Sequence, residues 1–232
     1  MSNQHKKFWD TEYTTAEHLA LSTAPSEDLQ KYTRWMERNS EIRLNGATKV
    51  LDLGTGNGRN LIWLSQTFGC RGVGIDISKQ AITQAIKAGE GLPLTFAVKS
   101  MAEPIESRDG SFDIVLDMMS SHFLHEKERL LLRDEIARVL RPGGSLFFKG
   151  FLLDEDKHAA RMLRLNADPE GEKHAYIHPR FGVYEHVWTI DELEAYFKPL
   201  FEIKKIEKSH KHIMHGKAFK RRTMTVYLER CW

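Results

Sequence analysis

The sequence is poor in cysteine and has no excess of charge of one sign. Only two of its 232 residues are cysteines, Cys70 and Cys231, and they stand far apart in the chain. This count argues against a disulfide scaffold or a cysteine-based zinc site, and it fits a reducing compartment. The formal net charge is +2, so an electrostatic role has to depend on local clusters of charge.

Long apolar runs are also missing. No stretch approaches the length that crosses a membrane, and the polar residues 1–7 lack the apolar core of a signal peptide. We therefore expect a cytoplasmic protein without a membrane segment. The hydrophobic fraction of 41% and the charged fraction of 28% are those of an ordinary globular protein with a real core.

Three glycines form the first strong pattern. Residues 49–53 predict a buried strand, and Gly54, Gly56 and Gly58 follow at every second position before a helical pattern over 58–68. Glycine has no Cβ, so such a turn brings its backbone N–H groups close to a ligand. The G-x-G-x-G spacing differs from the G-x-G-x-x-G of dinucleotide sites, which disfavours an NAD-dependent oxidoreductase. A tight loop without a ligand is the alternative.

An acidic residue closes the next predicted strand, over residues 71–78. Asp76 lies roughly 20 residues beyond the glycine turn, where doubly wound nucleotide-binding folds hold a carboxylate for the ribose hydroxyls. A helix cap or a surface residue is the alternative. Further strands are predicted at 92–98, 111–117, 145–148, 201–208 and 223–229, with helices from Ser26 to about residue 45 and over 126–139 and 190–198.

Four segments of the chain resemble motifs of the class I S-adenosylmethionine-dependent methyltransferases of the small-molecule type. Asp52 and the glycine turn resemble motif I, residues 112–115 resemble the F-D-x-V motif, and residues 140–144 resemble the L-x-P-G-G segment. The segment from Trp9 to Tyr13 is similar to a W-D-x-x-Y lid. The resemblance implies an α/β fold: a doubly wound, mostly parallel seven-stranded sheet with an antiparallel last strand and an N-terminal helical lid.

The resemblance also implies an S-adenosyl-L-methionine site, with S-adenosyl-L-homocysteine as the product. In that site Asp76 binds the ribose, Asp52 or Asp117 holds the ammonium end, and Tyr13 lies near the methionine end. The turn that often carries an acid for the adenine amino group has Ser100 and Met101 here, which is a departure from the family pattern. The full implied set is Tyr13, Asp52, Gly54, Thr55, Gly56, Asn57, Gly58, Asp76, Ile77, Ser100, Met101 and Asp117.

Candidates for acid–base chemistry lie in two places. His122 and His125 follow the strand that ends at Asp117, and a neutral imidazole is able to remove a proton near physiological pH. Tyr184 and His186 lie in an aromatic segment over residues 176–188. The alternatives are a loop hydrogen bond, a helix cap or the filling of a crevice. Because no third ligand accompanies the two histidines, we expect no metal site.

Basic residues and histidines crowd the connection over residues 210–222. This loop predicts attraction of a small anionic or polar acceptor, with an RNA methyltransferase or a solvated loop as alternatives. A non-catalytic S-adenosylmethionine-binding protein is a third reading. We expect a monomer or homodimer with one domain, divided into a lid (1–45), a cofactor-binding core (46–150), an acceptor-side insertion (151–188) and a terminal helix and hairpin (189–232).

Overall fold

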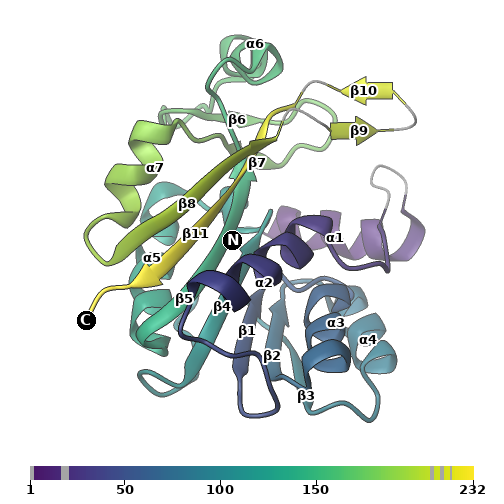
Figure 1. Cartoon of the computed structure of the whole chain (residues 1–232). Helices are drawn as coiled ribbons and strands as arrows, with labels where there is room; N and C mark the ends of the chain where they lie inside the picture. The colour runs from purple at the N-terminus through teal and green to yellow at the C-terminus, as the bar shows by residue number, and fades with distance from the viewer. Residues whose placement is uncertain (1–2, 17–20, 210–211, 215–216, 220) are drawn as a thin grey trace.

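A seven-stranded sheet forms the centre of the protein in a computed structural model that describes residues 3–16, 21–209, 212–214, 217–219 and 221–232 (Figure 1). Its strand order is β3-β2-β1-β4-β5-β11-β8. The strands are β1 (Lys49–Leu53), β2 (Arg71–Asp76), β3 (Leu94–Val98), β4 (Phe112–Met118), β5 (Leu140–Phe151), β8 (Phe201–Ser209) and β11 (Thr223–Arg230). Strands β1 to β5 pair in parallel, and β11 runs antiparallel to both β5 and β8. The doubly wound, mostly parallel sheet with an antiparallel last strand is therefore confirmed.

Helices cover both faces of the sheet (Figure 1). Side chains of α2 (Glu27–Asn39) and α3 (Arg59–Phe68) pack in one apolar core, and those of α5 (Glu126–Val139) and α7 (Ile190–Phe197) pack in the other. Helix α4 (Lys79–Ala88) contacts β2 and β3. No described helix is both long and apolar enough to span a bilayer.

Local sequence signals explain most of the helix ends. The Ser78 hydroxyl accepts the Ala81 N–H at the start of α4, and Gly69 closes α3 with a φ of 76°. Ser26 precedes α2 as expected but makes no side-chain cap. Its backbone N–H instead binds the Asn60 side chain at 3.0 Å. The predicted helix was too long, because α2 ends at Asn39.

The predicted break before the fifth strand is a bulge within that strand. Strand β5 begins at Leu140, directly after α5, and its register against β4 shifts between Phe112 and Ile114. Gly143 adopts a φ of 69° inside this irregular segment, a conformation that suits glycine. This bulge lets the chain pass from the end of α5 directly into the sheet.

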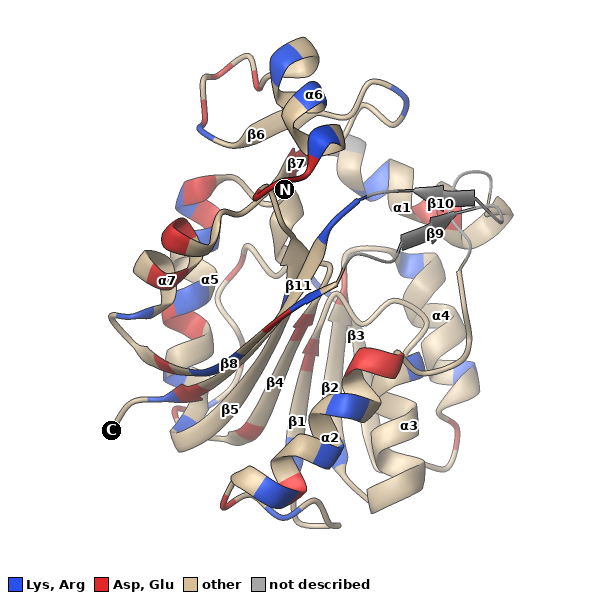
Figure 2. Cartoon of the chain, turned by 45° about the horizontal axis from the view of Figure 1, so that its top comes forward, with Lys and Arg blue, Asp and Glu red and all other residues tan. Residues whose placement is uncertain are grey.

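Three separate segments gather at the carboxyl ends of the parallel strands (Figure 2). They are the N-terminal helix α1 (Asn3–Thr15), the short helix η1 (Ser121–Phe123) after β4, and an insertion after β5. The insertion contains α6 (Lys157–Asn166), β6 (Ala175–Ile177) and β7 (Tyr184–His186). A separate ribbon pairs β9 (His212–Met214) with β10 (Lys217–Phe219). In an open α/β sheet this edge is where ligands bind.

Candidate functional site

The glycine turn links β1 to α3 at this edge. Gly54, Gly56 and Gly58 have φ values of 65°, 58° and 78°, which side chains with a Cβ rarely adopt. Thr55 N–H donates to the carbonyl of Ile75 at 2.9 Å and so ties the turn to β2. The turn is therefore a fixed backbone surface.

Three buried aspartates surround this turn at the ends of three strands. Asp52, Asp76 and Asp117 are 1%, 8% and 3% exposed. Asp76 accepts the Gly56 N–H at 2.9 Å and the Ser78 N–H at 2.8 Å. The carboxylate that was predicted from its distance along the chain thus lies directly against the glycine turn.

Burial changes the acidity of these groups. Burial raises the pKa of Asp52 to about 7, the Thr55 hydroxyl opposes that rise, and the negative charge of Asp76 adds to it. Burial also raises the pKa values of Asp76 and Asp117, although backbone or hydroxyl donors oppose the rise at each. A cluster of this kind favours a cationic ligand.

Helix α1 closes over the same turn. A Cβ placed on Gly56 would clash with the Tyr13 hydroxyl, so that hydroxyl lies against the turn. Asp10 accepts a hydrogen bond from the Ser78 hydroxyl at 2.8 Å, and Gln84 donates to the Tyr13 carbonyl at 2.7 Å. These contacts attach the lid to the start of α4.

The Ser100–Met101 turn lies beside the glycines on another side. Met101 is 6% exposed, and its Cε lies 3.2 Å from the position of a Cβ on Gly54. The Ser100 hydroxyl accepts the Ala102 N–H at 3.2 Å, so it caps its own turn. Ile77 is half-buried, and the Asn57 side chain donates to the Ser22 carbonyl at 3.1 Å.

A serine joins Asp117 to the glycine turn. The Ser120 hydroxyl oxygen lies 2.7 Å from the Asp117 carboxyl and 2.8 Å from the Leu53 carbonyl, within hydrogen-bonding distance of both. Met119, immediately before it, has a φ of 63°, which is strained for a residue with a Cβ. The strained turn directs the following residues, including His122, toward the insertion after β5.

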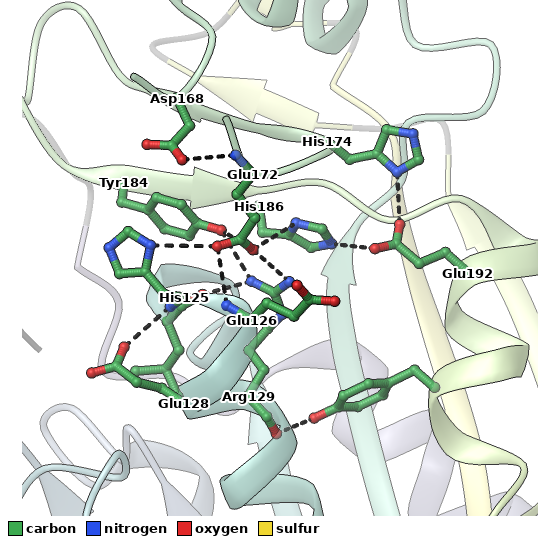
Figure 3. A network of polar contacts seen from close by, with 12 residues as sticks. His125, Glu126, Glu128, Arg129, Asp168, Glu172, His174, Tyr184, His186 and Glu192 are labelled. Carbon is green, nitrogen blue, oxygen red and sulfur yellow. Dashed lines mark hydrogen bonds and ion pairs between the residues drawn. The ribbon is translucent and has the colours of Figure 1, made fainter. Parts of the chain in front are cut away.

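Three of the four predicted acid–base candidates belong to a polar network shown in Figure 3. We call it the Glu172 network. The Glu172 carboxylate accepts hydrogen bonds from the Tyr184 hydroxyl, from Arg129 at 2.8 Å and from the Glu126 N–H at 3.1 Å. His125 Nδ1 lies 3.4 Å from the same carboxylate. The network joins α5 to the insertion.

His186 lies on the far side of this network. It is fully buried, with Nε2 3.0 Å from Glu192 and Nδ1 3.9 Å from Glu172 (Figure 3). Burial lowers its pKa, and burial raises that of Tyr184. Glu172, Arg129 and Glu192, which complete the network, have no sequence signal beyond being charged.

His122 is separate from the Glu172 network. It is 2% exposed, and its ring packs against Phe123 and Phe151 at centroid distances of 4.1 and 5.0 Å. Burial lowers its pKa to about 3, while the nearby charge of Glu185 acts to raise it. Its ring is therefore neutral.

The predicted basic loop lies largely outside the described residues. Only Arg221 and Arg222, at its end, have described side chains. Arg221 reaches the insertion, where its Nη2 lies 2.8 Å from Glu185. Within the described residues, no group of histidine, cysteine and acidic side chains has the arrangement of a metal site.

Comparison with known proteins identifies the part of the chain that carries the glycine turn. Residues 50–144 match a family described as a methyltransferase domain. A glycine/sarcosine/dimethylglycine N-methyltransferase from Actinopolyspora halophila is 31% identical over 136 residues, which are 56% of this chain and 24% of that protein. A 27-O-demethylrifamycin SV methyltransferase from Amycolatopsis mediterranei is 31% identical over 65% of this chain and 52% of that protein. The chain thus spans about half or less of these relatives.

Solved structures share the fold over nearly the whole chain. A protein described as an S-adenosylmethionine-dependent methyltransferase from Methanosarcina mazei aligns with a TM-score of 0.72 at 20% identity, covering 90% of this chain and 99% of that one. Another so described, from Anabaena variabilis, aligns with a TM-score of 0.70 at 18% identity and covers 98% of this chain and 94% of that one. At this identity the likeness concerns the fold.

Proposed function

We propose that the chain is a class I S-adenosylmethionine-dependent methyltransferase that transfers a methyl group from S-adenosylmethionine to a small polar acceptor, because residues 50–144 match a methyltransferase domain. The observation that carries the proposal is the glycine turn with three buried aspartates around it. A cytoplasmic location and a monomeric or homodimeric state are part of the same proposal, and the low cysteine count supports the first.

The residues at the turn fit this cofactor in shape and charge. S-adenosylmethionine carries a sulfonium and an ammonium group, and buried carboxylates with raised pKa values favour a cation. Gly54 and Gly56 have no Cβ, which allows a ligand to approach the backbone of the turn closely. An NAD cofactor fits less well, because its pyrophosphate is an anion and would meet three aspartates.

Each element at the turn has a proposed task. Asp76 holds the ribose hydroxyls, and Asp52 or Asp117 holds the ammonium group. Ile77, Ser100 and Met101 border the adenine, while Gly54, Thr55, Gly56, Asn57 and Gly58 form the floor of the site. Tyr13 has to withdraw from Gly56 when the cofactor enters and then covers it.

Positioning supplies much of the catalysis in this proposal. The bound cofactor supplies an electrophilic methyl group on a good leaving group, so an aligned acceptor gains rate without a covalent enzyme intermediate. His122, a neutral imidazole two residues beyond Ser120, is the proposed base for an acceptor that still carries its proton. His125, Tyr184 and His186 are proposed to hold the acceptor side in shape through the Glu172 network.

Calorimetry with S-adenosylmethionine and NAD tests the proposal directly. We expect the first to bind and the second not. Because Asp52 has a pKa of about 7, binding of a cation should expel its proton, so affinity should rise from pH 6 to pH 8 and heat should depend on the buffer. Asp52→Asn should remove this pH dependence. If S-adenosylmethionine binds at none of the pH values from 6 to 8, the proposal is refuted.

A further inference from the structure

A second buried polar cluster lies next to the Glu172 network. It consists of His122 of η1, Tyr176 of β6, Glu185 of β7 and Arg221 before β11, and we call it the acceptor cluster. His122, Tyr176 and Glu185 are 2%, 0% and 3% exposed, and the Arg221 side chain is 11% exposed. Polar side chains from four separate segments thus meet in a largely buried cluster.

The charges in the acceptor cluster balance. Arg221 Nη2 lies 2.8 Å from the Glu185 carboxylate and donates to the Tyr176 hydroxyl at 2.7 Å. The guanidinium also stacks on Phe151, with 3.3 Å from Cζ to the ring centroid. Burial acts to raise the Glu185 pKa, but the charge of Arg221 and the hydrogen bonds from Tyr176 and Arg221 act together to lower it below its ordinary value, so the carboxylate is ionised. One cation and one anion lie beside a neutral imidazole.

Three polar atoms of this cluster are buried and unpaired. His122 Nδ1, His122 Nε2 and Arg221 Nε have no hydrogen-bond partner among the residues that the structure describes. A buried polar atom without a partner costs about 1–3 kcal/mol, so native proteins seldom contain several of them together. Because His122 and Arg221 both pack on the Phe151 ring, their unpaired nitrogens lie in one cluster, and we infer that a ligand completes it with donors and an acceptor of its own.

The acceptor cluster is close to the proposed methyl donor along the chain and in space. Ser120, two residues before His122, binds the Leu53 carbonyl immediately before the glycine turn. Phe123 follows His122 and contacts Trp9 of the lid, with 5.2 Å between ring centroids. A ligand held by His122 therefore lies at the same sheet edge and under the same lid as the glycine turn.

We propose that the acceptor cluster binds an uncharged group with a hydroxyl on the carbon next to a carbonyl. This inference rests on the methyl transfer proposed above. The carbonyl oxygen accepts the free Arg221 Nε–H, and the hydroxyl donates to a ring nitrogen of His122. A carboxylate is disfavoured because Glu185 already neutralises Arg221, and a second buried anion would have no counter-charge. This narrows the expected anionic or polar acceptor to an uncharged one.

The transfer then balances as an O-methylation. The hydroxyl oxygen forms a bond to the methyl carbon, the carbon–sulfur bond breaks, and its electron pair stays on sulfur as the thioether of S-adenosylhomocysteine. The hydroxyl proton moves to the free nitrogen of His122. Burial disfavours the resulting imidazolium, and the nearby Glu185 carboxylate opposes that effect.

Two small probes that differ in charge test the proposal on the full chain with S-adenosylhomocysteine present. Glycolamide has a hydroxyl beside an uncharged carbonyl, and glycolate has a hydroxyl beside a carboxylate. Binding is followed by nuclear magnetic resonance. The Arg221 Nε–H signal is identified as the one missing in Arg221→Lys, and the His122 imidazole signal as the one missing in His122→Gln. We expect glycolamide to move both signals and glycolate to bind at least about tenfold more weakly.

Variants of the ion pair supply the decisive contrast. Glu185→Gln leaves the Arg221 charge uncompensated and should reverse the preference in favour of glycolate. Tyr176→Phe keeps both charges and should preserve the preference for glycolamide. A wild-type preference for glycolate, or no movement of either signal with glycolamide, overturns the proposal, even if Glu185→Gln does not fold. Calorimetry with S-adenosylmethionine separates the proposed methyl transfer from the proposed acceptor class. The proposal of methyl transfer is refuted if S-adenosylmethionine does not bind, whereas the probe experiments test only the acceptor class.

Discussion

Replacing Glu172 with glutamine should destabilise the protein strongly, although Glu172 touches neither proposed ligand. The change keeps the size of the side chain and removes its charge. Arg129, whose side chain is only 4% exposed, then loses the carboxylate that binds it at 2.8 Å. The Tyr184 hydroxyl and the Glu126 N–H lose the same acceptor.

The magnitude follows from the burial of Arg129. Breaking one side of a buried ion pair costs about 3–5 kcal/mol, because the remaining charge is left without compensation. Glutamine keeps one neutral oxygen, so we expect the low end, about 3 kcal/mol. For a domain of this size that corresponds to a fall in Tm of roughly 6–12 °C.

The pH dependence gives an independent check with a fixed sign. Burial acts to raise the Glu172 pKa, but the Tyr184 hydroxyl and Arg129 outweigh it and hold the pKa below its ordinary value. A carboxyl with a lowered folded pKa stabilises the fold above its unfolded pKa and loses that contribution as the pH falls through the folded value. The stability gap between wild type and Glu172→Gln should therefore shrink below about pH 4.

Urea unfolding at pH 7 and at a series of pH values below 4 measures both quantities. Glu170→Gln is the matched control, because Glu170 lies on the same loop and is exposed, and it should change stability by less than about 0.5 kcal/mol. A loss below about 1 kcal/mol for Glu172→Gln at pH 7 would refute the view that this network is structural. His125, Tyr184 and His186 would then need a role of another kind.

Three further predictions concern the lid and the two sites. Gly56→Ala should abolish measurable S-adenosylmethionine binding in calorimetry, because the φ of 58° is strained for alanine and the added Cβ lies where the proposed cofactor meets the turn. Unchanged affinity would contradict the proposed floor of the site. Burial lowers the pKa of His122 to about 3, so the unfolded chain binds a proton there that the folded chain does not, and the wild type should lose up to roughly 1.4 kcal/mol of stability per pH unit as the pH falls below 6.5. His122→Gln should lose less stability over the same series of urea unfolding measurements. Asp10→Ala removes the bond to Ser78 and should speed cleavage within residues 3–16 by protease, whereas Thr14→Ala, on the exposed side, should not.

The cofactor half of the protein was predictable because its signals are local. Gly54, Gly56 and Gly58 require backbone conformations that few other residues adopt, and Asp76 follows at a distance set by one helix and one strand. Buried parallel strands also produce apolar runs that show in the sequence. The predicted and observed ends of β1 to β4 therefore differ by at most two residues, whereas β5 is longer at both ends than the predicted strand.

The acceptor half was less predictable because its contacts are distant in sequence. Arg129 and Glu172 are 43 residues apart, and Glu185 and Arg221 are 36 apart. Each of these residues taken alone reads as an ordinary surface charge, and only the fold buries them as pairs. The histidines drew attention by their chemistry, but the sequence alone did not separate His122 from the network that holds His125 and His186.

Helix α1 explains why the two halves close together. His5, Trp9 and Tyr13 recur every four residues and so form one stripe along the helix. At one end His5 accepts the Tyr184 N–H at 3.1 Å, in the middle Trp9 contacts Phe123, and at the other end Tyr13 lies against Gly56. In the proposed reaction, a rigid helix that withdraws Tyr13 to admit the cofactor would also pull on the acceptor cluster. Its return would exclude water from both sites at once and so favour the acceptor over water in the displacement at the sulfonium methyl.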